Sequence, residues 1–99
     1  MDFEKIKHDI ANIVKKRMDQ KHYKVFIFGS RVNSSSLSRS DIDVGLQGEQ
    51  KINITVLENI KEDCYNLPIL QKIDVVDFRT VSEVFKKVAL EKIEVLYEQ

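Results

Sequence analysis

The chain has 99 residues, enough for one compact core, and we expect residues 1–99 to form a single domain. Its 16 basic and 16 acidic side chains cancel, so no overall charge attracts a membrane surface, and we do not expect nucleic acid as a direct template. No apolar run is long enough to span a bilayer, the first residues show no signal-peptide pattern, and Cys64 is the only cysteine. We therefore expect a cytoplasmic protein.

Apolar spacing predicts a helix and then a strand in the first third of the chain. Residues 2–20 place apolar side chains three and four positions apart, the pattern of an amphipathic helix. Residues 23–28 are aromatic and β-branched on both faces, which is typical of a central strand covered on both sides. The polar stretch 31–40 predicts a turn or short helix near Ser30, followed by a loop.

The middle of the chain predicts a strand, a helix and a second strand. Residues 41–47 alternate, so that Ile42, Val44 and Leu46 share one face and the two acids of this segment share the other. A loop over 48–51 precedes a helix over 53–66, with Asn53 as its N-cap and Pro68 shortly after its end. Residues 72–78 predict the next strand.

The C-terminal part predicts one more helix and leaves the last residues open. Thr80 to Glu83 has the Thr-x-x-Glu pattern of a capping box at a helix start. The apolar face of this helix would consist of Val81, Val84, Phe85, Val88 and Ala89. Residues 93–97 could continue the helix or form a short extended tail, and we favour the tail. The element order predicts an α/β (α+β) domain with a small mixed β-sheet packed against helices.

Acids on neighbouring strands indicate a divalent-metal site. Asp41 and Asp43 lie two apart, so they share a strand face about 6.5 Å apart along the strand axis. Two such carboxylates can hold one or two hard cations such as Mg²⁺, although an isolated Asp-x-Asp is more often a pair of solvated acids. A third acid, Asp74 or Asp77, could complete the site. Alternation places these two on opposite faces of their strand and leaves the choice open.

A Gly-Ser pair at the end of the first strand indicates a phosphate site. Gly29 would let a ligand approach the backbone closely, and the Ser30 hydroxyl and exposed N–H groups could bind phosphate oxygens. By itself the pair is an ordinary strand-ending turn. Together with the acids, it predicts a phosphate site beside a metal site.

The combination resembles the DNA polymerase β-like nucleotidyltransferase superfamily and, within it, the minimal nucleotidyltransferases (MNT proteins). The signature is Gly29-Ser30, ten residues and then Asp41-Ile42-Asp43, and residues 73–76, Ile-Asp-Val-Val, match the acid on the family's third strand. The resemblance implies a polymerase β-like core, two Mg²⁺ ions and a nucleoside triphosphate, ATP, as donor. It also implies site residues: catalytic metal ligands Asp41, Asp43 and Asp74, and nucleotide-phosphate contacts Gly29, Ser30 and Arg31.

MNT proteins are typically encoded beside a helical HEPN-domain protein, so the resemblance implies a toxin–antitoxin pair. In that pair this chain is the antitoxin, and it transfers AMP to a hydroxyl, specifically a tyrosine of the HEPN toxin. After Arg31 the chain reads Val-Asn-Ser, whereas many relatives read Ala-Arg-Gly. This departure leaves an alternative in which the acids are idle and the antitoxin neutralises its partner by contact alone.

Overall fold

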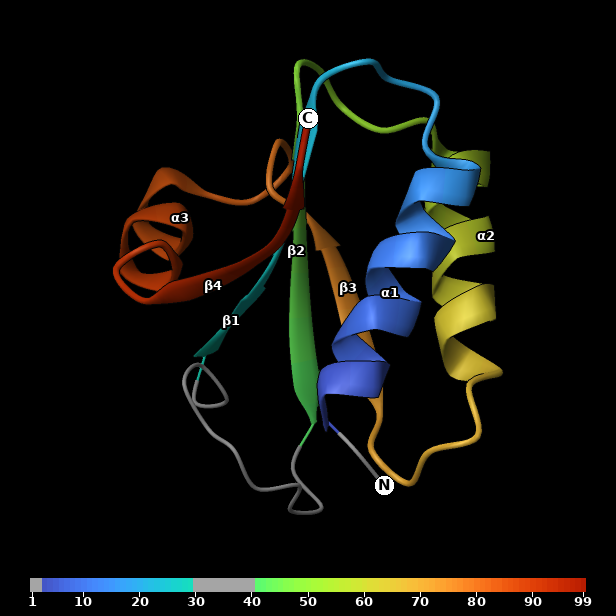
Figure 1. Cartoon of the computed structure of the whole chain (residues 1–99). Helices are drawn as coiled ribbons and strands as arrows, with labels where there is room; N and C mark the ends of the chain where they lie inside the picture. The colour runs from blue at the N-terminus through green and yellow to red at the C-terminus, as the bar shows by residue number, and fades with distance from the viewer. Residues whose placement is uncertain (1–2, 30–40) are drawn as a thin grey trace.

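The computed structural model describes residues 3–29 and 41–99, which form helices around one mixed sheet (Figure 1). In chain order the elements are α1 (Phe3–Arg17), β1 (Tyr23–Phe28), β2 (Ile42–Gly48), α2 (Ile54–Tyr65), β3 (Ile73–Asp77), α3 (Glu83–Ala89) and β4 (Ile93–Glu98). The turn, short helix and loop expected between Ser30 and Ser40 lie outside the described residues. None of the helices in the described ranges is long and apolar enough to cross a membrane.

The four strands lie in the order β3-β2-β1-β4. β1 pairs antiparallel with both β2 and β4, whereas β2 and β3 run parallel and are connected through α2. A parallel pair needs such a crossover, because the chain must return to the end of the sheet where the first strand began. The prediction of a small mixed sheet packed against helices is therefore confirmed.

The main core lies between the sheet and the two longer helices. α1 and α2 cover the same face of the sheet (Figure 1). The buried side chains of this core include Ile6, Ile10, Val14, Val25, Ile27, Ile42, Val44, Leu46, Ile60 and Cys64. Since the alternating apolar residues of β2 all point into this core, the acid between them points to the opposite face of the sheet.

A smaller aromatic core lies on that opposite face, beneath α3. The ring of Phe78 meets those of Phe26 and Phe28 edge to face, with centroid distances of 4.8 and 5.1 Å. Ala89 and Leu90, at the end of α3, pack against these rings. β1 is therefore covered on both sides, as the sequence predicts.

The aromatic core packs directly against the backbone of β2 at Gly45, which has no side chain to occupy that space. A Cβ atom at Gly45 would lie 2.4 Å from Phe26 Cε2 and 2.8 Å from Phe78 Cε1. Both rings are buried and have little room to move, so Gly45→Ala is expected to lower the free energy of unfolding by about 2 kcal/mol, measured by urea denaturation. In Gly48→Ala the new atom would meet the side-chain amide of Gln20, which can move away at the cost of its two exposed hydrogen bonds to the Gln50 backbone. An equal loss in that control variant would contradict the explanation.

The ends of several elements differ from the sequence prediction. α1 ends at Arg17 instead of residue 20, and β3 is shorter by one residue at each end. The predicted capping box is wrong: α3 begins at Glu83, and the hydroxyl of Ser82 caps it by accepting a hydrogen bond from the Phe85 amide. Thr80 instead donates its hydroxyl hydrogen to the Asp77 carbonyl, in the turn after β3. The predicted N-cap Asn53 is confirmed, since its side chain accepts from the Thr55 amide.

Two features of the C-terminal part differ from the sequence prediction: α3 is less buried, and the last residues form a regular strand. Residues 93–98 are extended, as favoured, but they form a full strand of the sheet along β1 and not a tail. The apolar face predicted for α3 is only partly buried. Ala89 packs on the aromatic core, and the partly exposed ring of Phe85 also meets Phe28 and Phe78, each at a centroid distance of 5.9 Å. Val84 and Val88 are exposed to solvent.

Candidate functional site

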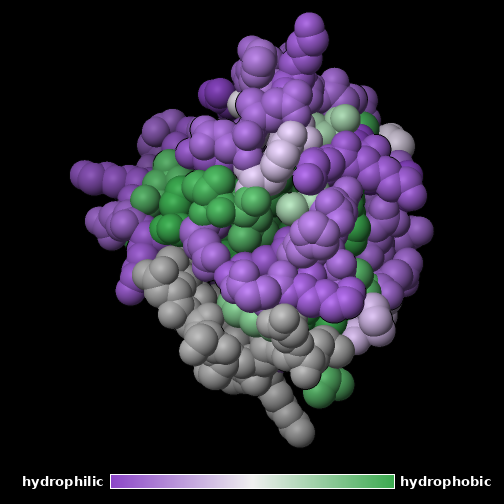
Figure 2. Space-filling model, in the orientation of Figure 1, coloured by the Kyte–Doolittle hydropathy of each residue, from purple (hydrophilic) through white to green (hydrophobic). Residues whose placement is uncertain are grey.

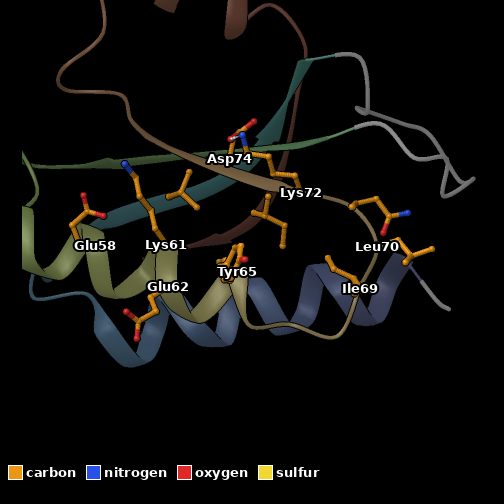
Figure 3. Close-up of a pocket in the computed structure, with 12 residues that line it drawn as sticks. Glu58, Lys61, Glu62, Tyr65, Ile69, Leu70, Lys72 and Asp74 are labelled. Carbon is orange, nitrogen blue, oxygen red and sulfur yellow. Dashed lines mark ion pairs between the residues drawn. The ribbon is translucent and has the colours of Figure 1, made fainter.

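Asp43 and Asp74 lie side by side on the sheet face that points away from α1 and α2. In the parallel pairing of β2 with β3, Asp43 is the register partner of Asp74, and neighbouring strands lie about 4.8 Å apart. Figure 3 shows Asp74 on the side of the sheet away from α2. The register of two strands thus brings together two carboxylates that are far apart in the sequence.

The charges of these acids disfavour one another. Partial burial, followed by the charges of Asp74 and Asp41, raises the pKa of Asp43 above its ordinary value of 3.8. Lys72 Nζ lies 3.6 Å from Asp74 Oδ1, but the two side chains are 72% and 41% exposed, and such surface pairs contribute little. A bound divalent cation would relieve the repulsion that remains.

The donor set fits Mg²⁺ if a phosphate ligand completes its coordination. Within residues 3–29 and 41–99, no three His, Cys, Asp or Glu side chains are grouped so that they could hold a metal by themselves. Mg²⁺ usually binds through one or two carboxylates, with water and substrate phosphates in its other positions. The Asp43–Asp74 pair meets that requirement. Asp41 is exposed directly before β2, at the entrance to the pair.

Asp77, the other candidate for the third acid, lies on the opposite face. It is 2% exposed, and its register partner Leu46 points into the main core. Its Oδ2 accepts a hydrogen bond from the Ile52 amide and its Oδ1 accepts one from the Arg79 amide, both at 2.9 Å. Asp77 therefore ties the end of β3 to the segment before α2, and of the two candidates only Asp74 joins Asp43.

Gly29 follows the last residue of β1 and lies beside the Asp43 carboxylate. Its φ of +85° lies in the left-handed region, and a Cβ atom there would lie 2.8 Å from Asp43 Oδ2. The missing side chain leaves the backbone next to the carboxylate accessible, as a phosphate site requires. Ser30 and Arg31, the other two predicted phosphate contacts, lie outside the described residues.

Gly29→Ala is expected to lower the free energy of unfolding by about 1–2 kcal/mol, because the new methyl group meets both backbone strain and the Asp43 carboxylate. Removing the carboxylate should remove part of this loss, so Gly29→Ala should cost less in an Asp43→Ala background. Urea denaturation of the four proteins in this double-mutant cycle measures the coupling. Equal losses in both backgrounds would contradict a contact between the two positions.

Two hollows lie near these residues, and they differ in character. The first, of about 930 Å³, runs between α2 and the outer edge of β3, past Lys61, Tyr65 and Leu70 (Figure 3). It meets the acid pair only at Asp74 and its neighbour Lys72, and Asp43 does not line it. We therefore place the candidate site on the open face of the sheet and not in this groove.

The second hollow, of about 560 Å³, lies on the same face as the acids. Its lining includes Phe28, Gly29, Val84, Phe85, Val88 and Ala89. The sequence does not predict these α3 residues as part of a site, because an apolar helical stripe normally indicates core. Lys72, which lies beside Asp74, was not predicted either, and its one signal in the sequence is its spacing of two residues from that acid.

Comparison with known proteins identifies relatives of this chain. Residues 8–99 match the sequence profile of the family described as "Polymerase beta, Nucleotidyltransferase". The chain is also 29% identical over 85 residues to a probable protein adenylyltransferase MntA of Haemophilus influenzae. That alignment covers 84% of this chain and 75% of the relative.

Solved structures share the fold. A chain of a toxin–antitoxin structure with AMP-PNP matches with a TM-score of 0.76 at 17% identity, over 94% of this chain and 73% of that chain. A chain of the complex of a tri-AMPylated Shewanella oneidensis HEPN toxin with an MNT antitoxin matches with a TM-score of 0.72 at 17% identity, over 95% and 71%. At such identities the likeness shows the fold alone, and it confirms the expected polymerase β-like core.

Proposed function

This chain belongs to the polymerase β nucleotidyltransferase family, and from that premise we propose that it is an MntA-type antitoxin that transfers AMP from ATP to a HEPN-domain partner. The observation that carries the proposal is the Asp43–Asp74 pair beside Gly29, which offers a metal site and a phosphate site together. The family supports the reaction class, and the MntA relative supports AMP as the transferred group and a protein as the acceptor. The toxin–antitoxin structures with the same fold support a HEPN partner.

Each residue of the site has a role in this proposal. Asp43 and Asp74, together with Asp41, would hold two Mg²⁺ ions jointly with the triphosphate, and Gly29, Ser30 and Arg31 would contact its phosphates. When bound, Mg²⁺ neutralises phosphate charge and lowers the pKa of the acceptor hydroxyl. The acceptor oxygen bonds to the α-phosphorus, pyrophosphate leaves, and the hydroxyl proton passes to the Asp74 carboxylate.

The open face of the sheet supports a separate protein as the acceptor. α1 and α2 cover the opposite face, and α3 packs over the aromatic core formed from β1 and Phe78. Within residues 3–29 and 41–99 no helix covers the acids, and the Asp74 side chain is 41% exposed, so it can meet a side chain that approaches from solvent. A tyrosine hydroxyl on the surface of a partner satisfies this geometry.

Label transfer tests the proposal. The chain and the HEPN-domain protein encoded beside it are incubated with Mg²⁺ and ATP labelled on the α-phosphate, and mass spectrometry then locates the modified side chain. We expect α-label on a partner tyrosine, no transfer of γ-label, and no transfer by the nearly isosteric variant Asp43→Asn. Absence of label with the wild-type chain would contradict the proposal. Protection of cells by Asp43→Asn would instead favour neutralisation by contact alone.

A further inference from the structure

α3 presents an apolar surface to solvent on the same side of the sheet as the acids. Val84 and Val88, one helical turn apart, are 75% and 63% exposed, and Phe85 is 43% exposed. Together with Ala89 these residues form what we call the α3 patch. Figure 2 shows hydrophobic surface gathered where Figure 1, in the same orientation, places α3. Contiguous apolar surface of this kind commonly marks a binding site for another protein.

The α3 patch continues towards the acid pair. It lines the hollow of about 560 Å³ that Gly29 also lines. The α-carbon of Gly29 adjoins the Asp43 carboxylate, since a Cβ there would lie 2.8 Å from Oδ2. Among the described residues, a chain that rests on α3 therefore has a continuous path along the surface to the acids.

The extent of the patch favours a protein segment as its occupant. A nucleobase could fill part of the hollow, but it would leave the outward sides of Val84 and Val88 in water. An amphipathic segment can cover a helix face and extend into the adjoining hollow at the same time. Apart from Glu91 and Lys92 the lining is apolar, which suits the aromatic side chains that are enriched in protein interfaces.

We propose that the α3 patch seats the apolar segment of the acceptor protein that carries the hydroxyl, and so places that hydroxyl beside Asp43 and Asp74. This inference rests on the proposed function, because an acceptor that is itself a protein needs a docking surface next to the acids. The α3 patch then selects the acceptor, while the acids and Gly29 bind the nucleotide and its metal ions.

The double variant Val84→Lys/Val88→Lys tests the inference. Both positions are exposed, so the fold is expected to persist, which circular dichroism verifies. Affinity for the HEPN partner should fall at least about tenfold, and AMP transfer at subsaturating partner should fall with it. Calorimetric binding of Mg²⁺·ATP should be unchanged. The control Ile54→Lys/Leu70→Lys adds the same charges at apolar positions that are 69% and 87% exposed outside the patch, and it should behave as wild type.

The possible results separate this inference from the proposed function. Wild-type affinity and transfer in Val84→Lys/Val88→Lys, with an active wild-type chain, would overturn the docking surface alone. Loss of Mg²⁺·ATP binding in the variant would also overturn it, because the patch would then serve the nucleotide. Conversion of a wild-type dimer to a monomer with transfer unchanged would assign the patch to a second copy. Loss of partner binding in the variant, with no transfer by wild type, would support the docking surface and contradict the proposed chemistry.

Discussion

Replacing Asp43 by asparagine is expected to lower AMP transfer at least about a hundredfold and to raise the stability of the metal-free protein. Asparagine keeps the size of the side chain but lacks the charge that binds a divalent cation. Stability should rise, because partial burial and the charges of Asp74 and Asp41 disfavour the ionised Asp43 in the folded chain. Thermal unfolding without divalent ions measures the gain, and transfer from α-labelled ATP measures the loss.

The pH dependence of this difference has a definite sign. Because the pKa of Asp43 is raised in the folded chain, its protonation favours folding fully below the ordinary value of 3.8, and this contribution is lost as pH rises through the folded pKa. The stability advantage of Asp43→Asn over wild type should therefore grow across that interval and stay constant above it. An advantage that shrinks as the pH rises would contradict the assignment.

Mg²⁺ and ATP should reverse the order of stability. A ligand that binds only the folded chain stabilises it by about 2.7 kcal/mol at a hundredfold excess over its Kd. Wild type should gain this stabilisation and Asp43→Asn should not. Equal increases in Tm for both proteins would show that the nucleotide binds without Asp43.

Substitutions of the two acids of β3, Asp77→Ala and Asp74→Ala, are expected to have opposite effects on stability and activity. Asp77→Ala leaves the Ile52 and Arg79 amides without their acceptor, and the Ile52 bond is buried, so the free energy of unfolding should fall by about 3 kcal/mol. Asp74→Ala removes a side chain that is 41% exposed and ion-paired with an exposed lysine, and its effect should stay within about 0.5 kcal/mol. Urea denaturation measures both changes.

The loss of activity should be large in Asp74→Ala and small in Asp77→Ala, the reverse of the order expected for the loss of stability. Per folded molecule, Asp77→Ala should retain AMP transfer, whereas Asp74→Ala should lose it about a hundredfold. Circular dichroism at the assay temperature gives the folded fraction needed for this comparison. An inactive but folded Asp77→Ala, together with an active Asp74→Ala, would exchange the roles assigned to the two acids.

The alternation along β2 was sufficient to predict which of its residues share a face, because one face is fully buried. Alternation could not choose between Asp74 and Asp77, since two residues three positions apart always fall on opposite faces of a strand. The choice depends on the register of β3 against β2, which pairs Asp74 with Asp43 and Asp77 with Leu46. That register is a tertiary property of the crossover through α2.

In the C-terminal part, too, local sequence patterns could not predict features that depend on tertiary contacts. The apolar spacing of α3 predicts a buried face, but Val84 and Val88 face solvent beside the candidate site. Residues 93–98 form a strand because they pair with the edge of β1 that β2 leaves free. The local sequence does not indicate that this edge is available. Thr80 fits a capping pattern, yet it bonds to the Asp77 carbonyl within the preceding turn.

Binding of Mn²⁺·ATP, followed by electron paramagnetic resonance, tests most directly whether Asp43 and Asp74 form one metal site shared with the nucleotide. Mn²⁺ serves as the paramagnetic substitute for Mg²⁺, and each protein is titrated in its folded state. Wild type should bind the complex, whereas Asp43→Asn and Asp74→Asn should each bind at least about tenfold more weakly. Wild-type affinity in either variant would contradict a shared site.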